Sequence, residues 1–410
     1  MTSLTRRNFL ANAALSSASI AMPRLLLAEA NTTLNSDARF VFVILRGALD
    51  GLAAVPAYGD GNYARMRGEL ALSAPDSAAG ALKLDGMFAL HPALSKLHQR
   101  YSVGELAVFH AVASPYRDRS HFDAQDLLEN GTRKPHGAND GWLNRALATL
   151  RPSRVDSDKY AMAFAQNIPL VLQGSTRVGS WAPSRMPDAD ADTLQRLADL
   201  YASDEYFAKR LQTALAADSM AASGSMDTDM QGGRRDPLGG IATIARAAGR
   251  MMQGKDGARV AVIETNGWDT HANQGAERGL LATRLTALDN ALDALRVELG
   301  AAWKTTAVLI ATEFGRTVAV NGTRGTDHGT ATCAFLVGGA VRGGRVVADW
   351  PGLATSNLYQ GRDLKPTLDL RSVCKGVLAE LFAVNEAHLE SKVFPDSREA
   401  KPMTALIRKA

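Results

Sequence analysis

The sequence predicts an α/β protein whose central sheet is mostly parallel and covered by helices on both faces. Five short apolar runs are continuous rather than alternating, which is typical of parallel strands buried on both sides. Segments with a helical apolar stripe alternate with these runs, and this alternation favours a parallel sheet. The chain has 410 residues, 46% hydrophobic and 21% charged, which is enough for one large α/β domain with a sizeable core.

The expected strands are residues 40–45, 106–112, 260–263, 307–311 and 334–337. A long helix is expected at 276–299, because its leucines recur at spacings of three and four residues and form one stripe. A similar stripe predicts a helix at 370–382.

An inserted helical cap is expected at about residues 182–256. Two helical segments, 189–216 and 238–253, lie on either side of a Ser-, Met-, Asp- and Gly-rich stretch at 218–235. That composition is typical of a mobile loop or linker.

Composition excludes several classes of protein. No apolar run approaches the roughly 18–20 residues that span a bilayer, which excludes a multi-spanning membrane protein. The net charge is +4 and the basic residues are scattered, so no nucleic-acid partner is expected. The two cysteines, Cys333 and Cys374, cannot build a disulfide scaffold or a thiolate zinc site, and we expect both to be buried.

The first 30 residues have the features of a twin-arginine signal peptide. Arg6 and Arg7 precede a mildly apolar stretch at 11–22, and Ala28-Glu29-Ala30 offers a cleavage site. The alternative is an ordinary amphipathic helix with two arginines. We expect a mature chain of residues 31–410 that is periplasmic or secreted. The twin-arginine export machinery would carry it already folded, with its metal chosen in the cytosol, and no stable membrane span would remain after cleavage.

Polar residues cluster where the expected strands end. They are Asp50 after the first strand, Ser120 and His121 after the second, Asp269 and His271 after the third, Glu313 and Arg316 after the fourth, and Asp327 and His328 just before the fifth. Ligands of open parallel sheets bind beyond the carboxyl ends of the strands. Carboxylates and imidazoles without cysteine suit zinc, manganese, iron or magnesium. Taken singly, a strand-end aspartate or Ser120 could be a plain helix cap, but four converging segments predict a metal-dependent site.

Six motifs of the chain together resemble a bacterial family known as domain of unknown function 1501. They are Leu45-Arg46-Gly47 with Asp50-Gly51-Leu52, the run from Arg119 to Gln125, Trp268-Asp269-Thr270-His271, the run from Glu313 to Thr317, the run from Gly325 to Gly329, and Asp349-Trp350-Pro351-Gly352-Leu353. The resemblance covers essentially the whole mature chain. The family is grouped with the alkaline phosphatase and sulfatase superfamily, which implies an alkaline phosphatase-like three-layer sandwich.

The resemblance implies one or two divalent metal ions, such as zinc, manganese, magnesium or calcium. It assigns Asp269, His271 and His328 to the first ion, and Asp50 and Glu313 to the second. Superfamily enzymes usually have an adjacent Asp-His pair where this chain has Glu313-Phe314, and such a pair occurs later, as Asp327-His328. The second ion therefore loses a ligand unless His121 or Asp327 replaces it. The sequence thus favours one ion over two.

The resemblance also implies a hydrolase of phosphate or sulfate esters that acts on a small anionic ester. Ser120 would be the nucleophile, activated by a bound metal, with His121 beside it. Arg316 or Arg119 would pair with the anionic oxygens of the substrate. A formylglycine sulfatase is disfavoured, because neither cysteine has a proline two residues later. The alternative function is an exported binding or structural protein with a degenerate metal site and no turnover. An enzyme should keep a coordination position open, whereas a structural site is closed by protein ligands.

Overall fold

The computed structural model describes residues 37–77, 80–150, 157–183, 191–222 and 240–409. These residues belong to one unit, Asn35–Ala410. The expected signal peptide, residues 1–30, lies outside the described residues. No helix within the described ranges combines the length and the apolar character needed to cross a bilayer.

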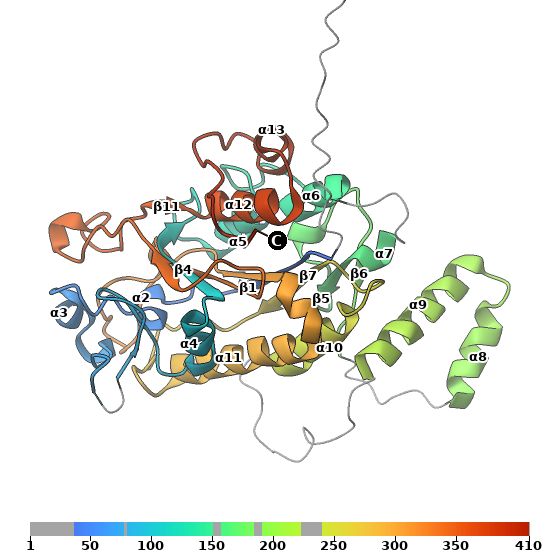
Figure 1. Cartoon of the computed structure of the whole chain (residues 1–410), viewed down its shortest axis with the longest axis horizontal. Coiled ribbons are helices and arrows are strands. Elements are labelled where there is room, and N and C mark those ends of the chain that lie inside the picture. Colours follow the sequence, from blue (N-terminus) through green and yellow to red (C-terminus); the bar gives the residue numbers. More distant parts are fainter. Residues whose placement is uncertain (1–36, 78–79, 151–156, 184–190, 223–239, 410) are drawn as a thin grey trace, which may run out of the picture. The chain divides into compact units, whose positions relative to one another are not determined.

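A nine-stranded sheet forms the centre of this unit, and all five expected strands belong to it (Figure 1). Strand β1 (Arg39–Leu45) lies between β7 (Val260–Thr265) and β8 (Thr306–Ala311) and pairs with both in parallel. The full order is β10-β4-β9-β8-β1-β7-β5-β6, with β11 also paired to β4. The remaining bounds are β4 Leu106–Ala113, β5 Ala161–Phe164, β6 Gly179–Ser180, β9 Thr332–Val337, β10 Arg345–Val347 and β11 Leu368–Asp369.

Strand β9 corrects the expectation that all five apolar runs are parallel. It pairs antiparallel with both of its neighbours, β4 and β8. The connection from β8 to β9 covers residues 312–331 and contains no crossover helix. It therefore leaves and re-enters the sheet at the same edge, so β9 must run back against β8. The other pairings in this sheet are parallel, which makes it mostly parallel as expected.

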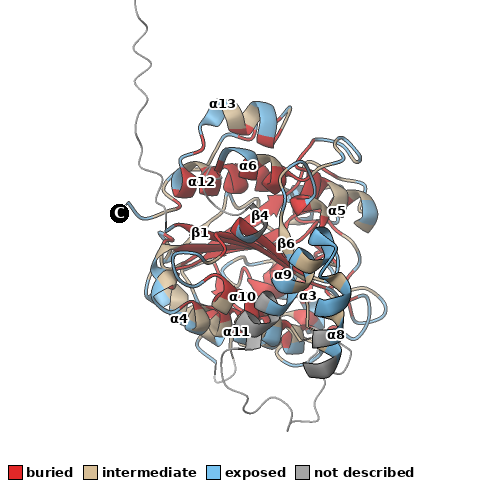
Figure 2. Cartoon of the chain, turned by 90° about the vertical axis from the view of Figure 1, so that its right-hand side faces the viewer, coloured by how far each residue is buried: buried red, intermediate tan, exposed pale blue. Residues whose placement is uncertain are grey.

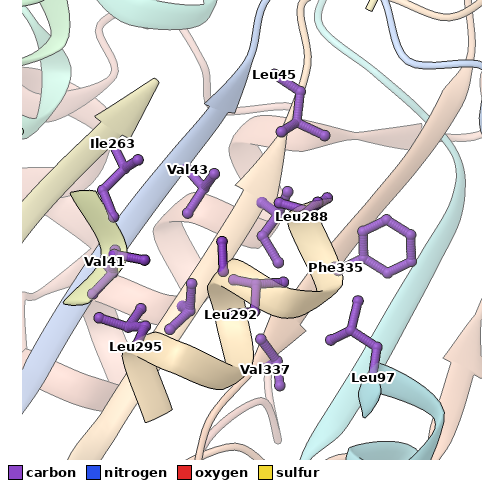
Figure 3. Close-up of a cluster of buried hydrophobic side chains, with 14 of the residues drawn as sticks. Val41, Val43, Leu45, Leu97, Ile263, Leu288, Leu292, Leu295, Phe335 and Val337 are labelled. Carbon is purple, nitrogen blue, oxygen red and sulfur yellow. The ribbon is translucent and has the colours of Figure 1, made fainter. Parts of the chain in front are cut away.

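Helices cover both faces of the sheet, so the architecture is a three-layer α/β sandwich (Figures 1 and 2). Alternate residues of β1 pack into different layers because successive side chains of a strand point to opposite faces. Phe40, Phe42 and Ile44 pack with α6 (Trp142–Leu150) and α12 (Leu370–Phe382). Figure 3 shows the opposite layer, where Val41, Val43 and Leu45 meet leucines of α11 (Leu280–Leu299). Burying each such side chain stabilises the fold by about 1.5–3 kcal/mol.

The two helices expected from leucine-rich stripes are both present. Helix α12 has the expected bounds, and α11 begins at Leu280 rather than at 276. Its start is set by Gly279, whose φ of 132° is unsuited to a helix. The shorter helices are α2 Gly51–Ala54, α3 Tyr63–Arg67, α4 Ser95–Ser102, α5 His121–Asn130, α7 Ser157–Tyr160 and α13 Glu386–His388. A separate hairpin pairs β2 (Leu82–Lys83) with β3 (Ala89–Leu90).

The region of the expected cap contains three helices, α8 (Ala191–Tyr201), α9 (Glu205–Ala222) and α10 (Ile241–Met251). Helix α10 packs into the same apolar cluster as α11 and so belongs to a covering layer of the sheet. Whether α8 and α9 act as a cap stays a prediction. The expected loop covers residues 218–235; α9 continues through its first residues to Ala222, and the rest of it lies outside the described residues.

Candidate metal centre

Four side chains from three chain segments meet at the edge of the sheet where the parallel strands end. His121 opens α5 after β4, while Asp269 and His271 follow β7. His328 lies in the connection from β8 to β9, shortly before β9 begins at Thr332. Because β9 is antiparallel, its first residue lies at the same edge as the last residues of the parallel strands, and this brings His328 to the other three.

Ligand atoms of three of these residues lie close enough to share one ion. Potential ligand atoms of His121, Asp269 and His328 all lie within 4.8 Å of one another. The Nε2 atoms of His121 and His328 are 2.9 Å apart, and His121 Nε2 is 3.4 Å from Asp269 Oδ2. His271 adds a fourth donor, with its Nε2 3.0 Å from both His328 Nε2 and Asp269 Oδ1.

Each of the three histidines is oriented through its other ring nitrogen. His121 Nδ1 lies 2.8 Å from Glu313 Oε1, and His271 Nδ1 lies 3.2 Å from Asp327 Oδ1. His328 Nδ1 lies 2.9 Å from the backbone oxygen of Arg119. Since an ionised carboxylate or a carbonyl only accepts, each Nδ1 must donate its proton. In a neutral imidazole this leaves the Nε2 lone pair free, so three lone pairs face a shared point.

This donor set fits a divalent transition metal. Ligand bonds of about 2.0–2.1 Å at tetrahedral angles place donor atoms about 3.3 Å apart, close to the 2.9–3.5 Å found here. Metal-bound histidines nearly always donate their second N–H to a carboxylate or carbonyl, as all three do here. The centre is reachable from solvent, since the side chains of His271 and Asp269 are 45% and 38% exposed.

The local charges favour the protonation states that a metal needs. Burial and the nearby His121 lower the pKa of His328. Burial opposes ionisation of Asp269, but the hydrogen bond and charge of Arg316 outweigh it and lower the pKa of that carboxyl. The hydrogen bond to Glu313 raises the pKa of His121. A neutral His328 and an ionised Asp269 are the ligand forms, while metal binding must displace any proton on His121.

A glycine lets the loops of the centre approach closely. Gly47 follows β1 with a φ of +117°, and a Cβ at this position would lie 2.6 Å from the Asp269 backbone nitrogen. Its own N–H donates to Glu313 Oε1 at 2.8 Å. Gly47 therefore lies between the segments that follow β7 and β8 and contacts both through its backbone. A larger residue at this position would strain the backbone.

Comparison with known protein families assigns the chain to a family. The family described as "Protein of unknown function (DUF1501)" matches residues 37–394. The chain belongs to the DUF1501 family. This confirms the resemblance carried by its motifs. No curated protein sequence matches this DUF1501 chain.

Several solved structures are distantly similar to this DUF1501 chain. Ps i-CgsB, solved with k-i-k-neocarrahexaose, has a TM-score of 0.39 and 11% identity, covering 89% of this chain and 77% of that one. Phosphonate monoester hydrolase of Agrobacterium radiobacter has a TM-score of 0.33 and 11% identity, with coverages of 84% and 73%. The C-terminal periplasmic domain of EcEptC from Escherichia coli, solved with Zn, has a TM-score of 0.32 and 9% identity, with coverages of 74% and 74%.

Glu313 and Asp327, both expected as ligands, contact the histidines of the DUF1501 centre from outside. Glu313 is buried, and besides His121 it accepts hydrogen bonds from Gly47 N, Gln125 Nε2 and Thr312 Oγ1. These four donors occupy both of its oxygens. Asp327 Oδ1 faces His271 Nδ1 and accepts from Asn321 Nδ2 at 3.0 Å. Both carboxylates therefore orient histidines. Among the described residues, no contact joins an oxygen of Glu313 or Asp327 to the Nε2 atoms of the histidines or to Asp269.

Asp50, the first expected ligand of a second ion, is not brought to the centre. It is buried at the start of α2, where its Oδ2 lies 2.5 Å from Arg67 Nη2 and accepts from Gln274 Nε2 at 2.7 Å. Its Oδ1 accepts from Ala53 N at 3.1 Å. The ion pair with Arg67 is almost fully buried on both sides, so a guanidinium compensates the charge that a second ion would otherwise balance.

The two expected arginines hold other residues in place. Arg316 is buried, with a side chain that is 0% exposed, and it pairs with Asp269 and with the hydroxyl and carbonyl of Thr326. It therefore positions a ligand carboxylate. The Arg119 side chain points to Asp363 and Gln360, while its backbone oxygen accepts from His328.

Ser120, the expected nucleophile, lies at the N-cap of α5, directly before His121. Its side chain makes no capping hydrogen bond, and its backbone N–H donates to the Tyr116 hydroxyl at 3.3 Å. Among the residues that the structure describes, no hydrogen bond joins the Ser120 hydroxyl to the histidines or to Asp269. The adjacency to His121 places Ser120 near the centre, while its role as a nucleophile stays a prediction.

Sequence reasoning missed two glutamines that support the centre. Gln125 contacts Glu313, and its position four residues after His121 on one helix is a signal that could have revealed it. Gln274 is fully buried and links Asp50 to the hydroxyls of Thr270 and Thr326. Nothing in the sequence marks Gln274, because its partners come from separate segments.

Proposed function

We propose that this chain is an exported, metal-dependent hydrolase of phosphate or sulfate esters. The observation that carries the proposal is a cluster in which the Nε2 atoms of His121 and His271 and Oδ1 of Asp269 lie within 3.5 Å of His328 Nε2, while each histidine Nδ1 is bound to an oxygen acceptor. Packing alone does not account for this arrangement, because it brings unshared nitrogen lone pairs close together. A bound divalent ion would act as a Lewis acid on an ester oxygen and lower the pKa of an oxygen nucleophile.

The residues of the chain have separable tasks in this proposal. His121, His271, His328 and Asp269 would hold the ion, and zinc or manganese suits this nitrogen-rich set. Glu313, Asp327 and the Arg119 carbonyl fix the three rings, and Arg316 fixes Asp269. The exposed sides of His271 and Asp269 leave room for a small anionic ester to approach from solvent.

Ser120 is the proposed nucleophile. It opens a ten-residue helix, and the positive end of a helix favours an incoming phosphate or sulfate group. Its side chain makes no capping hydrogen bond, and in this proposal its hydroxyl turns toward the ion held by the neighbouring His121. Ser120→Ala should abolish turnover while metal content stays at the wild-type level. Full hydrolysis by this variant would reject Ser120 as the nucleophile.

The second candidate is a binding or structural protein with no turnover. The fourth donor, His271, favours it, because three histidines and one carboxylate would close a tetrahedral ion. Catalysis requires an expanded coordination number or release of one of these four donors. The two functions therefore differ in whether the loaded centre still accepts an exogenous ligand.

The deciding experiment combines metal analysis with an ester screen. The full chain would be produced in a host with twin-arginine export, analysed for metals and assayed against phosphate, phosphonate and sulfate esters. His328→Ala should lose both the metal and the activity, whereas His136→Ala, a variant of an exposed histidine outside the centre, should lose neither. A metal-loaded protein that hydrolyses none of the esters and excludes exogenous ligands would favour the second candidate.

Export through the twin-arginine machinery is the proposed route to the periplasm. Replacing Arg6 and Arg7 by lysine in the full chain should leave the precursor in the cytoplasm. Fractionation and immunoblotting would measure this, with a wild-type chain as the reference. An unchanged periplasmic yield would contradict the route.

A further inference from the structure

Two arginines contact His328 in addition to the residues of the metal centre. His328 Nδ1 donates to the backbone oxygen of Arg119 at 2.9 Å, and Arg362 Nη2 donates to the backbone oxygen of His328. We call Arg119 and Arg362 the arginine pair. Since Nδ1 and Nε2 lie on different sides of an imidazole, the backbone oxygen of Arg119 contacts the side of the His328 ring that is turned away from the ligand atoms.

One buried carboxylate holds both guanidinium groups. Asp363 is fully buried, its Oδ2 accepts from Arg119 Nε at 2.8 Å, and its Oδ1 accepts from Arg362 Nε at 2.8 Å. Asp363 can balance only one of the two positive charges. Among the described residues, neither Arg119 Nη1 nor Arg362 Nη1 has a hydrogen-bond partner, so each fork keeps a free donor.

Arg119 is also held in place by other contacts. Its φ of 62° is unusual for a residue other than glycine. Its Nη2 donates to Gln360 Oε1 at 2.6 Å, and its guanidinium carbon lies 5.9 Å from the centre of the Tyr359 ring. A cation fixed in this way loses little further conformational entropy when a ligand binds.

Two further cations, Arg117 and Lys365, accompany the arginine pair. Arg117 donates to the backbone oxygens of Ser114 and Tyr116, and within the described ranges it pairs with no carboxylate. Lys365 lines the adjoining cavity. Carboxylates also lie close by: Asp118 is next to Arg119 in the chain, Asp349 is on the cavity wall, and the charge of Asp369 acts on Arg117. The free Nη1 donors of the arginine pair, rather than a net positive charge, therefore distinguish this surface.

We propose that the arginine pair binds a second anionic group of the substrate, distinct from the ester group that is cleaved at the metal centre. The chemistry that would be recognised is a planar or tetrahedral oxyanion, because the free Nη1 donors of two guanidinium groups can bind separate oxygens of sulfate, phosphate or carboxylate. A cavity of about 450 Å³, lined in part by Tyr359, Gln360 and Lys365, adjoins the pair and could take the remainder of the substrate. This inference rests on the proposed function only in that the metal centre is where the ester would be cleaved.

The test separates anion binding from catalysis. The metal-stripped full chain at pH 8 would be titrated calorimetrically with sulfate, phosphate and acetate at constant ionic strength, which keeps screening equal. The three anions distinguish tetrahedral from carboxylate recognition. Arg362→Gln should weaken binding of the preferred anion by about tenfold or more. Arg65→Gln, at an exposed arginine of α3 that contacts Asn62, is the matched control and should bind like the wild type.

A second arm uses esters that the protein hydrolyses. Arg362→Gln should raise KM for an ester carrying an additional anionic group and leave KM for the matching mono-anionic ester unchanged. Anion binding that depends on Arg362 in a protein without esterase activity would sustain this site and reject the proposed function. Two results would overturn the anion site and leave the proposed function standing. One is hydrolysis in which Arg362→Gln changes KM equally for both esters, and the other is wild-type anion affinity in the variant.

Discussion

Glu313→Gln tests whether the orientation of a histidine governs metal affinity. The Glu313 carboxylate accepts from His121 Nδ1, and a glutamine oxygen in the same place could still accept that proton. The glutamine nitrogen would replace Oε2 and could donate to Thr312 Oγ1, which can in turn donate to the Leu45 backbone oxygen. The substitution thus removes the negative charge and little else.

The expected size of the effect follows from the loss of this charge. A carboxylate behind a histidine strengthens the imidazole as a ligand, and removing such a partner typically weakens metal binding 10–100-fold, or about 1.4–2.7 kcal/mol. Burial raises the energy of the ionised Glu313, yet hydrogen bonds from His121, Gln125 and neighbouring groups lower its pKa. The wild-type carboxylate is therefore charged at neutral pH, so the glutamine changes the charge there.

The assay is calorimetric titration of zinc into the metal-stripped full chain at neutral pH. Glu264→Gln is the matched control, because Glu264 lies near the end of β7, as Glu313 lies just after β8, but contacts Arg46 and none of the three histidines. We expect the control to bind zinc like the wild type and Glu313→Gln to bind it 10–100-fold more weakly. Equal affinity for all three proteins, with native circular dichroism, would refute the claim that Glu313 tunes the centre.

Three further predictions concern stability. Arg67→Met should lower the unfolding free energy by about 3–5 kcal/mol because Asp50 stays buried without its partner, and adding Asp50→Asn should recover most of it in urea denaturation. Burial lowers the pKa of His110 to about 4 from 6.5, so its neutral form stabilises the fold above pH 6.5 and this stability is lost as pH falls toward 4. The wild type should therefore lose on the order of 3 kcal/mol relative to His110→Gln between pH 7 and pH 4, and parallel pH curves would contradict this. Gly315→Ala places a Cβ on the Ala331 carbonyl oxygen and should cost about 1–3 kcal/mol and weaken zinc binding, whereas unchanged denaturation curves would show that the backbone yields freely.

The sequence predicted most of the fold because its signals are local. The five apolar runs correspond to β1, β4, β7, β8 and β9, and the leucine stripe corresponds to α11. Short edge strands such as β6, with two residues, carry no periodicity to detect. The direction of β9 was also missed, because an apolar run looks the same whichever way its neighbours run.

The candidate site was predictable in part for the same reason. The topological rule that parallel strands end at one edge brings the segments after β4, β7 and β8 together, and with them His121, Asp269 and His271. His328 reaches the same edge only because β9 is antiparallel, which the rule does not predict. The separate roles of the carboxylates were not predictable, since Asp50 and Glu313 both follow apolar strands. What separates them is their partners: Arg67 lies against Asp50, and His121 lies against Glu313.

The sequence by itself determined the kind of residues at the centre, their place at the strand ends and the family to which the chain belongs. Only the tertiary structure decided which side chains face one another, because a hydrogen bond joins atoms from segments that can be 192 residues apart, as in His121 and Glu313. Whether a carboxylate is a ligand, a support for a histidine or half of a buried ion pair depends on which donors surround it. Those donors come from other strands and loops, and folding alone brings them into contact.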